Sequence, residues 1–161
     1  MILRFALALF LAALTGPVHA LSCMAPDVVW LYQHIKEDEA DYLLVKGKVI
    51  LTELPNYAEP AGMRQTVAFT MARAVGQALS VSGFDAPFDR PITIRSSCAG
   101  SWCGAPEGLS EDRHFFALRM EGDRLVLERG PCGGLVERWS EEEEARLLNC
   151  HLNGECELKG F

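Results

Sequence analysis

The segment YLLVKGKVILT, residues 42–52, decides the predicted fold. Its apolar residues alternate along the chain and so share one face of a β-strand: Leu43, Val45, Val49 and Leu51. Gly47 lies in the middle of that face. A glycine inside a strand marks a bulge or a sharp bend, and a strand needs such a bend when it closes a small barrel. The segment therefore predicts one strand of a small barrel.

Later segments extend the β pattern. Residues 92–96 alternate and predict a short strand, and residues 114–120 and 124–129 predict two strands joined by a tight hairpin at residues 121–123. Residues 66–81 are ambiguous, because some of their apolar residues recur every four positions and an overlapping set alternates. Periodicity alone leaves both helix and strand open for this segment.

Turn-forming residues separate these strands. Glycine, proline, asparagine and cysteine gather in three stretches that predict loops, namely residues 55–62, 83–91 and 98–106. The last of these contains two cysteines, so we expect disulfides to hold it.

Two helices are expected beside the strands. The first opens at residues 25–27 with a proline suited to a first turn, and its apolar face is formed at helical spacing by Val28, Leu31, Tyr32 and Ile35. The second begins at Ser140, which can cap free backbone amides, with Glu143 three residues later as in a capping box. We expect this helix to end near Asn149.

Six cysteines predict a disulfide framework, because an even number in an exported chain is typical of one: Cys23, Cys98, Cys103, Cys132, Cys150 and Cys156. Six cysteines allow 15 pairings, and the sequence does not choose among them. A local bridge between Cys150 and Cys156 is sterically reasonable, because Gly154 lets the loop turn back. A metal site would need cysteine pairs spaced as C-x2-C, which the sequence lacks.

The first 20 residues have the three parts of a secretory signal peptide. Arg4 is basic, residues 5–14 are an apolar run, and residues 18–20 offer small residues for cleavage after Ala20. A lipoprotein signal is the alternative, in which Cys23 would be the first mature residue and would carry lipid. We expect a secreted or periplasmic protein, off the membrane unless Cys23 is lipidated.

Length and charge limit the remaining possibilities. Residues 21–161 are long enough for a single domain with one core. Without Arg4 the chain has 14 basic and 22 acidic side chains. Such an acidic domain repels phosphate backbones and anionic lipid, so neither nucleic acid nor membrane is an expected partner.

The sequence contains no recognisable catalytic constellation. Ser101 follows Gly100 directly, which fails the Gly-x-Ser-x-Gly spacing of a nucleophile elbow. Cys103 follows a tryptophan as in thioredoxin-type motifs, but the second cysteine is missing. The three histidines of the mature chain are scattered, at His34, His114 and His151. We therefore expect a non-enzyme without metal or cofactor.

Five features follow one another along the chain: Cys23, the glycine-centred strand of residues 43–51, the SCAGSWCG motif of residues 97–104, the hairpin of residues 115–127 and the Pro-Cys-Gly of residues 131–133. Their order resembles the netrin-like module shared by tissue inhibitors of metalloproteinases, netrins and complement C-terminal domains. The resemblance spans residues 23–149.

The resemblance implies a mainly β domain with flanking helices: a disulfide-tied, five-stranded Greek-key barrel of the OB-fold type. It implies a strand at residues 66–81. It also implies that Cys23 is bonded to Cys103 or Cys132, and Cys98 to the other.

The expected function is that of an exported module that binds a protein or, as a weaker possibility, a carbohydrate. Its expected contact residues are Cys23, Met24, Ser101, Trp102 and Gly104. Trp30 and Trp139 are expected to pack in the core, Trp30 on the apolar face of the first helix. A metalloproteinase inhibitor is the alternative, but it needs a free amine on Cys23, and Leu21 and Ser22 precede that residue if cleavage follows Ala20. A small hydrolase or redox protein is a third hypothesis.

Overall fold

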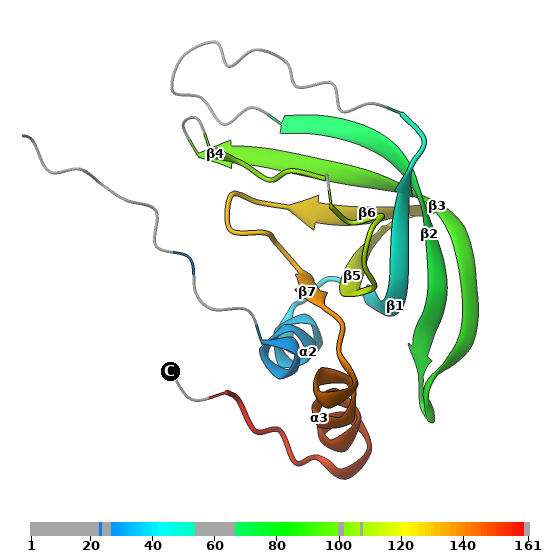
Figure 1. Ribbon diagram of the computed structural model, residues 1–161, viewed down its shortest axis with the longest axis vertical. Helices are drawn as coiled ribbons and strands as arrows, with labels where there is room; N and C mark the ends of the chain where they lie inside the picture. Colours follow the sequence, from blue (N-terminus) through cyan, green and yellow to red (C-terminus); the bar gives the residue numbers. More distant parts are fainter. Residues whose placement is uncertain (1–22, 24–26, 54–66, 100–101, 107, 160–161) are drawn as a thin grey trace, which may run out of the picture.

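The computed structural model describes residues 23, 27–53, 67–99, 102–106 and 108–159 (Figure 1). Along the chain its elements are α2 (Val28–Glu37), β1 (Tyr42–Leu51), β2 (Val67–Ser80), β3 (Gly83–Ala99), β4 (Trp102–Cys103), β5 (His114–Glu121), β6 (Arg124–Arg129), β7 (Val136–Arg138) and α3 (Glu141–Asn153). The protein is therefore mainly β with flanking helices, as predicted. The expected signal peptide and the predicted loop at residues 55–62 lie outside the described residues.

Five strands form a closed ring in the order β1-β2-β3-β6-β5, which β1 closes by pairing with β5. Every pair in the ring is antiparallel except β3 with β6, which is parallel. Two short strands lie beside the ring: β4 pairs with the end of β3, and β7 pairs with the first half of β5.

Strand β1 matches the prediction from its alternation. Val45 and Val49 are buried inside the ring, and Leu43 and Leu51 pack against the same core. Gly47 lies opposite Gly76 of β2 without a shift in register, so the feature at Gly47 is a close approach of two paired strands and not a bulge. Residues 66–81 contain strand β2, as the resemblance implied.

Two of the predicted loops belong wholly or partly to strand β3. Residues 83–91 form its first half, and Cys98 and Ala99 form its end. Pro87 and Pro91 are exposed, and among the described residues β6 pairs with β3 over residues 93–96, beyond both prolines. Proline is tolerated where one side of a strand has no neighbour. The sequence analysis was therefore wrong to assign a turn-rich connection here.

Two apolar cores lie on opposite faces of the β1–β5 pair. The first fills the ring and includes Phe116, Leu118, Ile92 and Leu127. The second packs the two helices against the outside of the ring through buried residues that include Val28, Val29, Leu31, Leu44, Phe115 and Leu147. The helices therefore cover one side of the ring and leave the outer face of β2 exposed (Figure 1).

The helix ends follow from their capping residues. Asp27 caps α2 by accepting from the backbone amides of Val29 and Trp30. Ser140 caps α3 as predicted, by accepting from the amide of Glu143. Helix α3 continues past the predicted end at Asn149 to Asn153, where Gly154 takes the left-handed conformation that commonly ends a helix.

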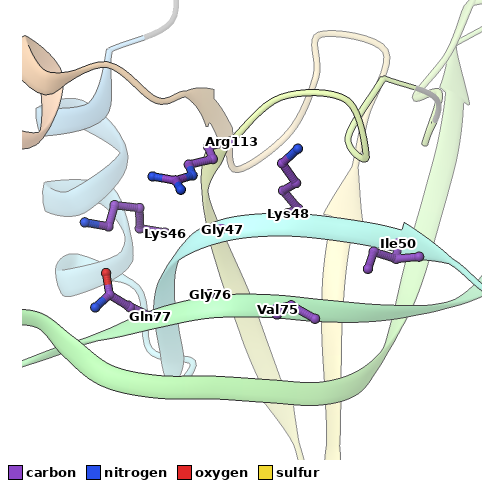
Figure 2. A pocket seen from close by; sticks show the side chains of 8 residues that line it. All are labelled: Lys46, Gly47, Lys48, Ile50, Val75, Gly76, Gln77 and Arg113. Atoms are coloured by element: carbon purple, nitrogen blue, oxygen red, sulfur yellow. The ribbon is translucent and has the colours of Figure 1, made fainter.

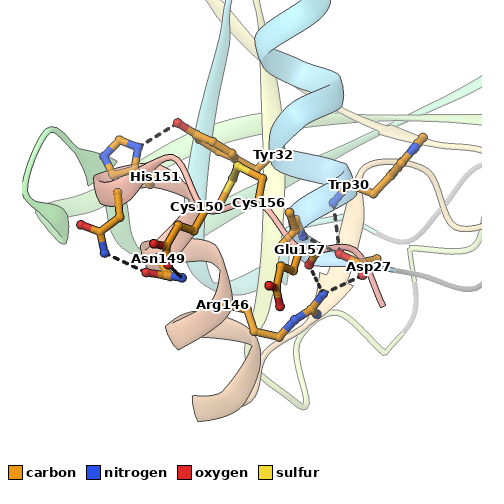
Figure 3. Close-up of a disulfide and its surroundings, with 12 residues drawn as sticks. Asp27, Trp30, Tyr32, Arg146, Asn149, Cys150, His151, Cys156 and Glu157 are labelled. Carbon is orange, nitrogen blue, oxygen red and sulfur yellow. Dashed lines mark hydrogen bonds and ion pairs between the residues drawn. A yellow bond between two sulfur atoms is a disulfide. The ribbon is translucent and has the colours of Figure 1, made fainter. Parts of the chain in front are cut away.

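Ion pairs join the two helices to the C-terminal segment (Figure 3). The Arg146 guanidinium lies 2.9 Å from Asp27 Oδ2 and 2.6 Å from Glu143 Oε2. It also donates to the carbonyl of Glu157 at 2.7 Å. One arginine therefore ties the start of α2, helix α3 and the C-terminal segment together.

Trp30 does not lie on the apolar face of α2. Its side chain is 36% exposed and stacks on His34. The residues that face the core are Val28, Val29, Leu31 and Tyr32. Trp139, by contrast, is partly buried against the helix-side core, as predicted. No helix in the described ranges is long and apolar enough to cross a membrane.

Candidate functional site

Three disulfides tie the domain together: Cys23–Cys132, Cys98–Cys103 and Cys150–Cys156. Their Cα–Cα distances are 5.3, 4.0 and 4.3 Å. The predicted local bridge at Cys150–Cys156 is present, and Cys23 has one of the two partners that the resemblance implied. Three disulfides fit an oxidising, extracellular environment.

The Cys98–Cys103 bridge closes a hairpin at the end of β3. In this hairpin Cys98 pairs with Cys103, and Ala99 pairs with Trp102. The following residue continues the contact, since the amide of Gly104 donates to the carbonyl of Ser97 at 3.0 Å. The side chain of Trp102 is 66% exposed. A covalently closed strand pair therefore holds a large aromatic side chain in solvent.

Gly104 lets this hairpin lie directly against the end of β6. A Cβ atom at Gly104 would come within 2.3 Å of the carbonyl oxygen of Arg129 and within 2.7 Å of that of Gly130. Gly104 is buried. Gly104 therefore allows two backbone segments to approach closely.

The Arg129 side chain joins the hairpin to the turn that contains Cys132. Its Nε and Nη2 atoms donate to the carbonyl of Ala105 at 3.2 and 3.0 Å. Its Nη1 atom donates to the carbonyl of Gly133. The Cys23–Cys132 bridge then attaches the N-terminal segment to the same turn. We call this region, formed by residues 97–99, 102–106, 129–133 and Cys23, the disulfide edge.

The disulfide edge brings together three of the five predicted contact residues. Cys23 and Trp102 are exposed there, and Gly104 is buried beneath them. Met24 and Ser101 lie outside the described residues. Arg129 could not be identified from the sequence, because a single arginine at the end of a strand gives no indication that its guanidinium reaches two carbonyl groups across a turn.

The described histidines have structural contacts. His34 stacks on Trp30, and burial lowers the pKa of His114, whose ring nitrogen faces the carbonyl of Asp112. His151 lies between the hydroxyl of Tyr32 at 2.9 Å and the carbonyl of Ser80 at 2.8 Å. The first contact joins α3 to α2 (Figure 3), and the second joins α3 to the end of β2. Within the described ranges no group of three or more histidine, cysteine or acidic side chains could hold a metal ion.

No protein-family model, curated protein or solved structure matches this chain. Its function must therefore be inferred from the residues and their geometry. In the disulfide edge, the exposed Trp102 lies on a strand pair that is closed by a disulfide, and the Arg129 side chain is hydrogen-bonded to the segment that follows.

Proposed function

We propose that this protein is an exported, non-enzymatic binding module that contacts a protein partner through the disulfide edge, with Trp102 as the central contact. The observation that carries the proposal is the exposed Trp102 side chain on a strand pair closed by Cys98–Cys103. Tryptophan is enriched among the residues that dominate protein interfaces.

Rigidity supports this choice of site. An interface residue that is already ordered loses little conformational freedom on binding, so more of its contact energy appears as affinity. The backbone of Trp102 is paired with that of Ala99, and Arg129 holds the segment that follows it. An exposed tryptophan on a mobile loop would lack this advantage.

The strand order supports an OB-fold of the netrin-like type as the scaffold. After β3 the chain forms β5 and β6, of which β6 returns beside β3 and β5 lies beside β1. Setting the two-residue β4 aside, this is a five-stranded ring with a crossover, as expected of a small Greek-key barrel. In such a barrel the segments at one rim are free to vary and to bind.

Binding to a protein partner is tested by removing Trp102. We would immobilise the mature protein, recover proteins from the extracellular or periplasmic fraction of its source, and compare Trp102→Ala with Trp30→Ala. Trp30 is a matched control because it is also exposed but lies on α2. The proposal expects that the wild type and Trp30→Ala form a saturable complex with the purified partner. The affinity for that partner should be at least about tenfold weaker with Trp102→Ala. Equal affinity of both variants would overturn the choice of site.

A metalloproteinase inhibitor is the second candidate, and the position of Cys23 favours it. Cys23 is exposed and is bonded to Cys132 in the same edge as Trp102. Zinc chelation would require Cys23 to be the first residue with a free amine. Inhibition of a zinc protease by a chain that begins at Cys23, and its loss in a chain that begins at Leu21, would support this candidate over the first.

A further inference from the structure

A groove of about 410 Å³ lies on the outer face of β1 and β2, away from the disulfide edge. Its lining residues are Lys46, Gly47, Lys48, Ile50, Val75, Gly76, Gln77 and Arg113 (Figure 2). Three of the eight are cations and none is acidic. This is notable in a chain with a formal net charge of −7.

The floor of the groove is bare backbone. Gly47 and Gly76 lie opposite each other where the paired strands β1 and β2 approach closely. A side chain at either position would collide with the backbone of the other strand. The glycines are therefore required by this close approach, and their backbone lines the groove between the outward-facing side chains of the two strands.

Two of the cations are held in place by uncharged partners. The Lys48 ammonium donates to the carbonyl of Glu111 at 2.9 Å, and the Arg113 guanidinium lies over the Trp139 ring, 5.5 Å from its centroid. In Figure 2 both side chains lie on the same side of β1. Within the described ranges neither forms an ion pair with a carboxylate. Their positive charges are therefore available to an anion.

The third cation, Lys46, is neutralised by a carboxylate that also connects it to Arg113. Lys46 lies 2.6 Å from Glu144, which also accepts from the indole nitrogen of Trp139 at 2.7 Å. Trp139 in turn lies beneath Arg113. This chain of contacts fixes the position of the Arg113 guanidinium before any ligand arrives, which reduces the cost of binding.

The other end of the groove is apolar. Ile50 and Val75 are 47% and 37% exposed; Val75 lies opposite Lys48 on the neighbouring strand, and Ile50 lies further along β1 (Figure 2). Exposed apolar residues beside fixed polar groups are typical of sites that bind small molecules. The groove thus combines an anion-binding end with an apolar end.

We propose that this groove binds a small amphiphilic anion, that is, a carboxylate, sulfate or sulfonate attached to an apolar group. Lys48 and Arg113 bind the oxyanion, and Ile50 and Val75 contact the apolar part. This site is independent of the proposed protein-binding function, because it lies on different residues from the disulfide edge.

The test uses two fluorescent probes that differ in one group. The anionic probe is 1-anilinonaphthalene-8-sulfonate, and the neutral probe is N-phenyl-1-naphthylamine, which lacks the sulfonate. The wild-type full domain is compared with Lys48→Gln/Arg113→Gln and with the control Lys36→Gln/Arg90→Gln. The control removes the same two charges from exposed positions outside the groove.

The proposal expects saturable binding of one anionic probe per chain, with amide chemical-shift changes centred on Gly47 and Gly76. Charge-assisted contacts predict a dissociation constant raised about tenfold or more in the Lys48/Arg113 variant and unchanged in the control. The neutral probe should bind at least about tenfold more weakly than the anionic one. The proposal would be overturned if the two probes bound with equal affinity or if both variants lost the same affinity. It would also be overturned by chemical-shift changes centred on other residues, or by binding that does not saturate.

Discussion

Gly47 of β1 and Gly76 of β2 face each other so closely that neither position can accept a side chain. A Cβ atom at Gly47 would lie 2.1 Å from the carbonyl oxygen of Val75, and one at Gly76 would lie 2.1 Å from that of Lys46. Real Cβ atoms do not approach backbone oxygens this closely. The pair therefore permits the close approach of β1 and β2, two neighbours in the ring, at the place where both glycines line the groove.

Gly47→Ala is expected to lower the free energy of unfolding by about 2–3 kcal/mol, because the added methyl group must push two strands apart. Urea unfolding followed by circular dichroism measures this. Gly130→Ala is the matched control, since its Cβ would meet a single atom at 3.9 Å. Equal stability of the two variants would show that the paired strands β1 and β2 tolerate a side chain at this position.

Thr70→Val is expected to stabilise the protein by about 1 kcal/mol. The Thr70 side chain is buried, and its hydroxyl has no hydrogen-bond partner among the described residues. Valine has nearly the same shape and removes a polar group that lost its contact with water. The midpoint of thermal unfolding should rise, and a fall would mean that the hydroxyl has a partner in the folded protein.

Asp27→Asn is expected to destabilise the protein at neutral pH and to have little effect in acid. Burial acts to raise the pKa of Asp27, but hydrogen bonds from the Lys159 amide, Arg146 and the amides of Trp30 and Val29 outweigh it and hold the pKa below its usual value. A lowered pKa stabilises the folded state above about pH 4 and loses this effect as the pH falls through the folded-state value.

Asparagine keeps the Oδ1 that caps α2, but it replaces the Oδ2 that accepts from Arg146 and from the Lys159 amide, so the substitution removes the charge together with these two contacts. We expect a difference in unfolding free energy of about 1–3 kcal/mol at pH 7 that declines below about pH 4. Chemical unfolding at a series of pH values measures it. A difference that stays constant from neutral to acidic pH would contradict the assigned role of the Asp27 carboxylate.

The disulfides are expected to contribute to stability according to the length of chain that each one closes. Cys23–Cys132 spans 109 positions and Cys150–Cys156 spans 6. Loop-closure entropy predicts about 4–5 kcal/mol for a loop of the first size and about 2 kcal/mol for the second. Each cysteine pair is replaced with alanines, and the loss in the free energy of unfolding is measured. A larger loss for the Cys150–Cys156 variant than for the Cys23–Cys132 variant would contradict the predicted order.

The inward face of β1 and the start of α3 could be predicted from the sequence because both depend on local patterns. Alternation identified residues that do fill the ring, and the Ser140 cap depends on contacts three residues apart. The helical phase of α2 also places Trp30 away from Val28 and Leu31, so its exposure followed from the sequence although the analysis placed it in the core.

The remaining features depend on contacts between distant segments. Pro87 and Pro91 predict turns by themselves, and they are tolerated in β3 because no strand of the described part of the chain pairs with that side of β3 there. Strand pairing likewise brings Arg113 of one segment beside Lys48 of another. Neither relationship is visible in local sequence, so both the length of β3 and the groove had to be read from the structure.

The proposed site depends on an exported domain with all six cysteines in disulfides, because the Cys98–Cys103 bridge closes the strand pair that carries Trp102. Intact mass spectrometry of the protein recovered from its source, alkylated before and after reduction, tests this requirement. The account predicts a chain that begins at Leu21, with no cysteine alkylated before reduction and all six alkylated after it. A chain that retains residues 1–20, or that shows alkylated cysteines before reduction, would contradict it.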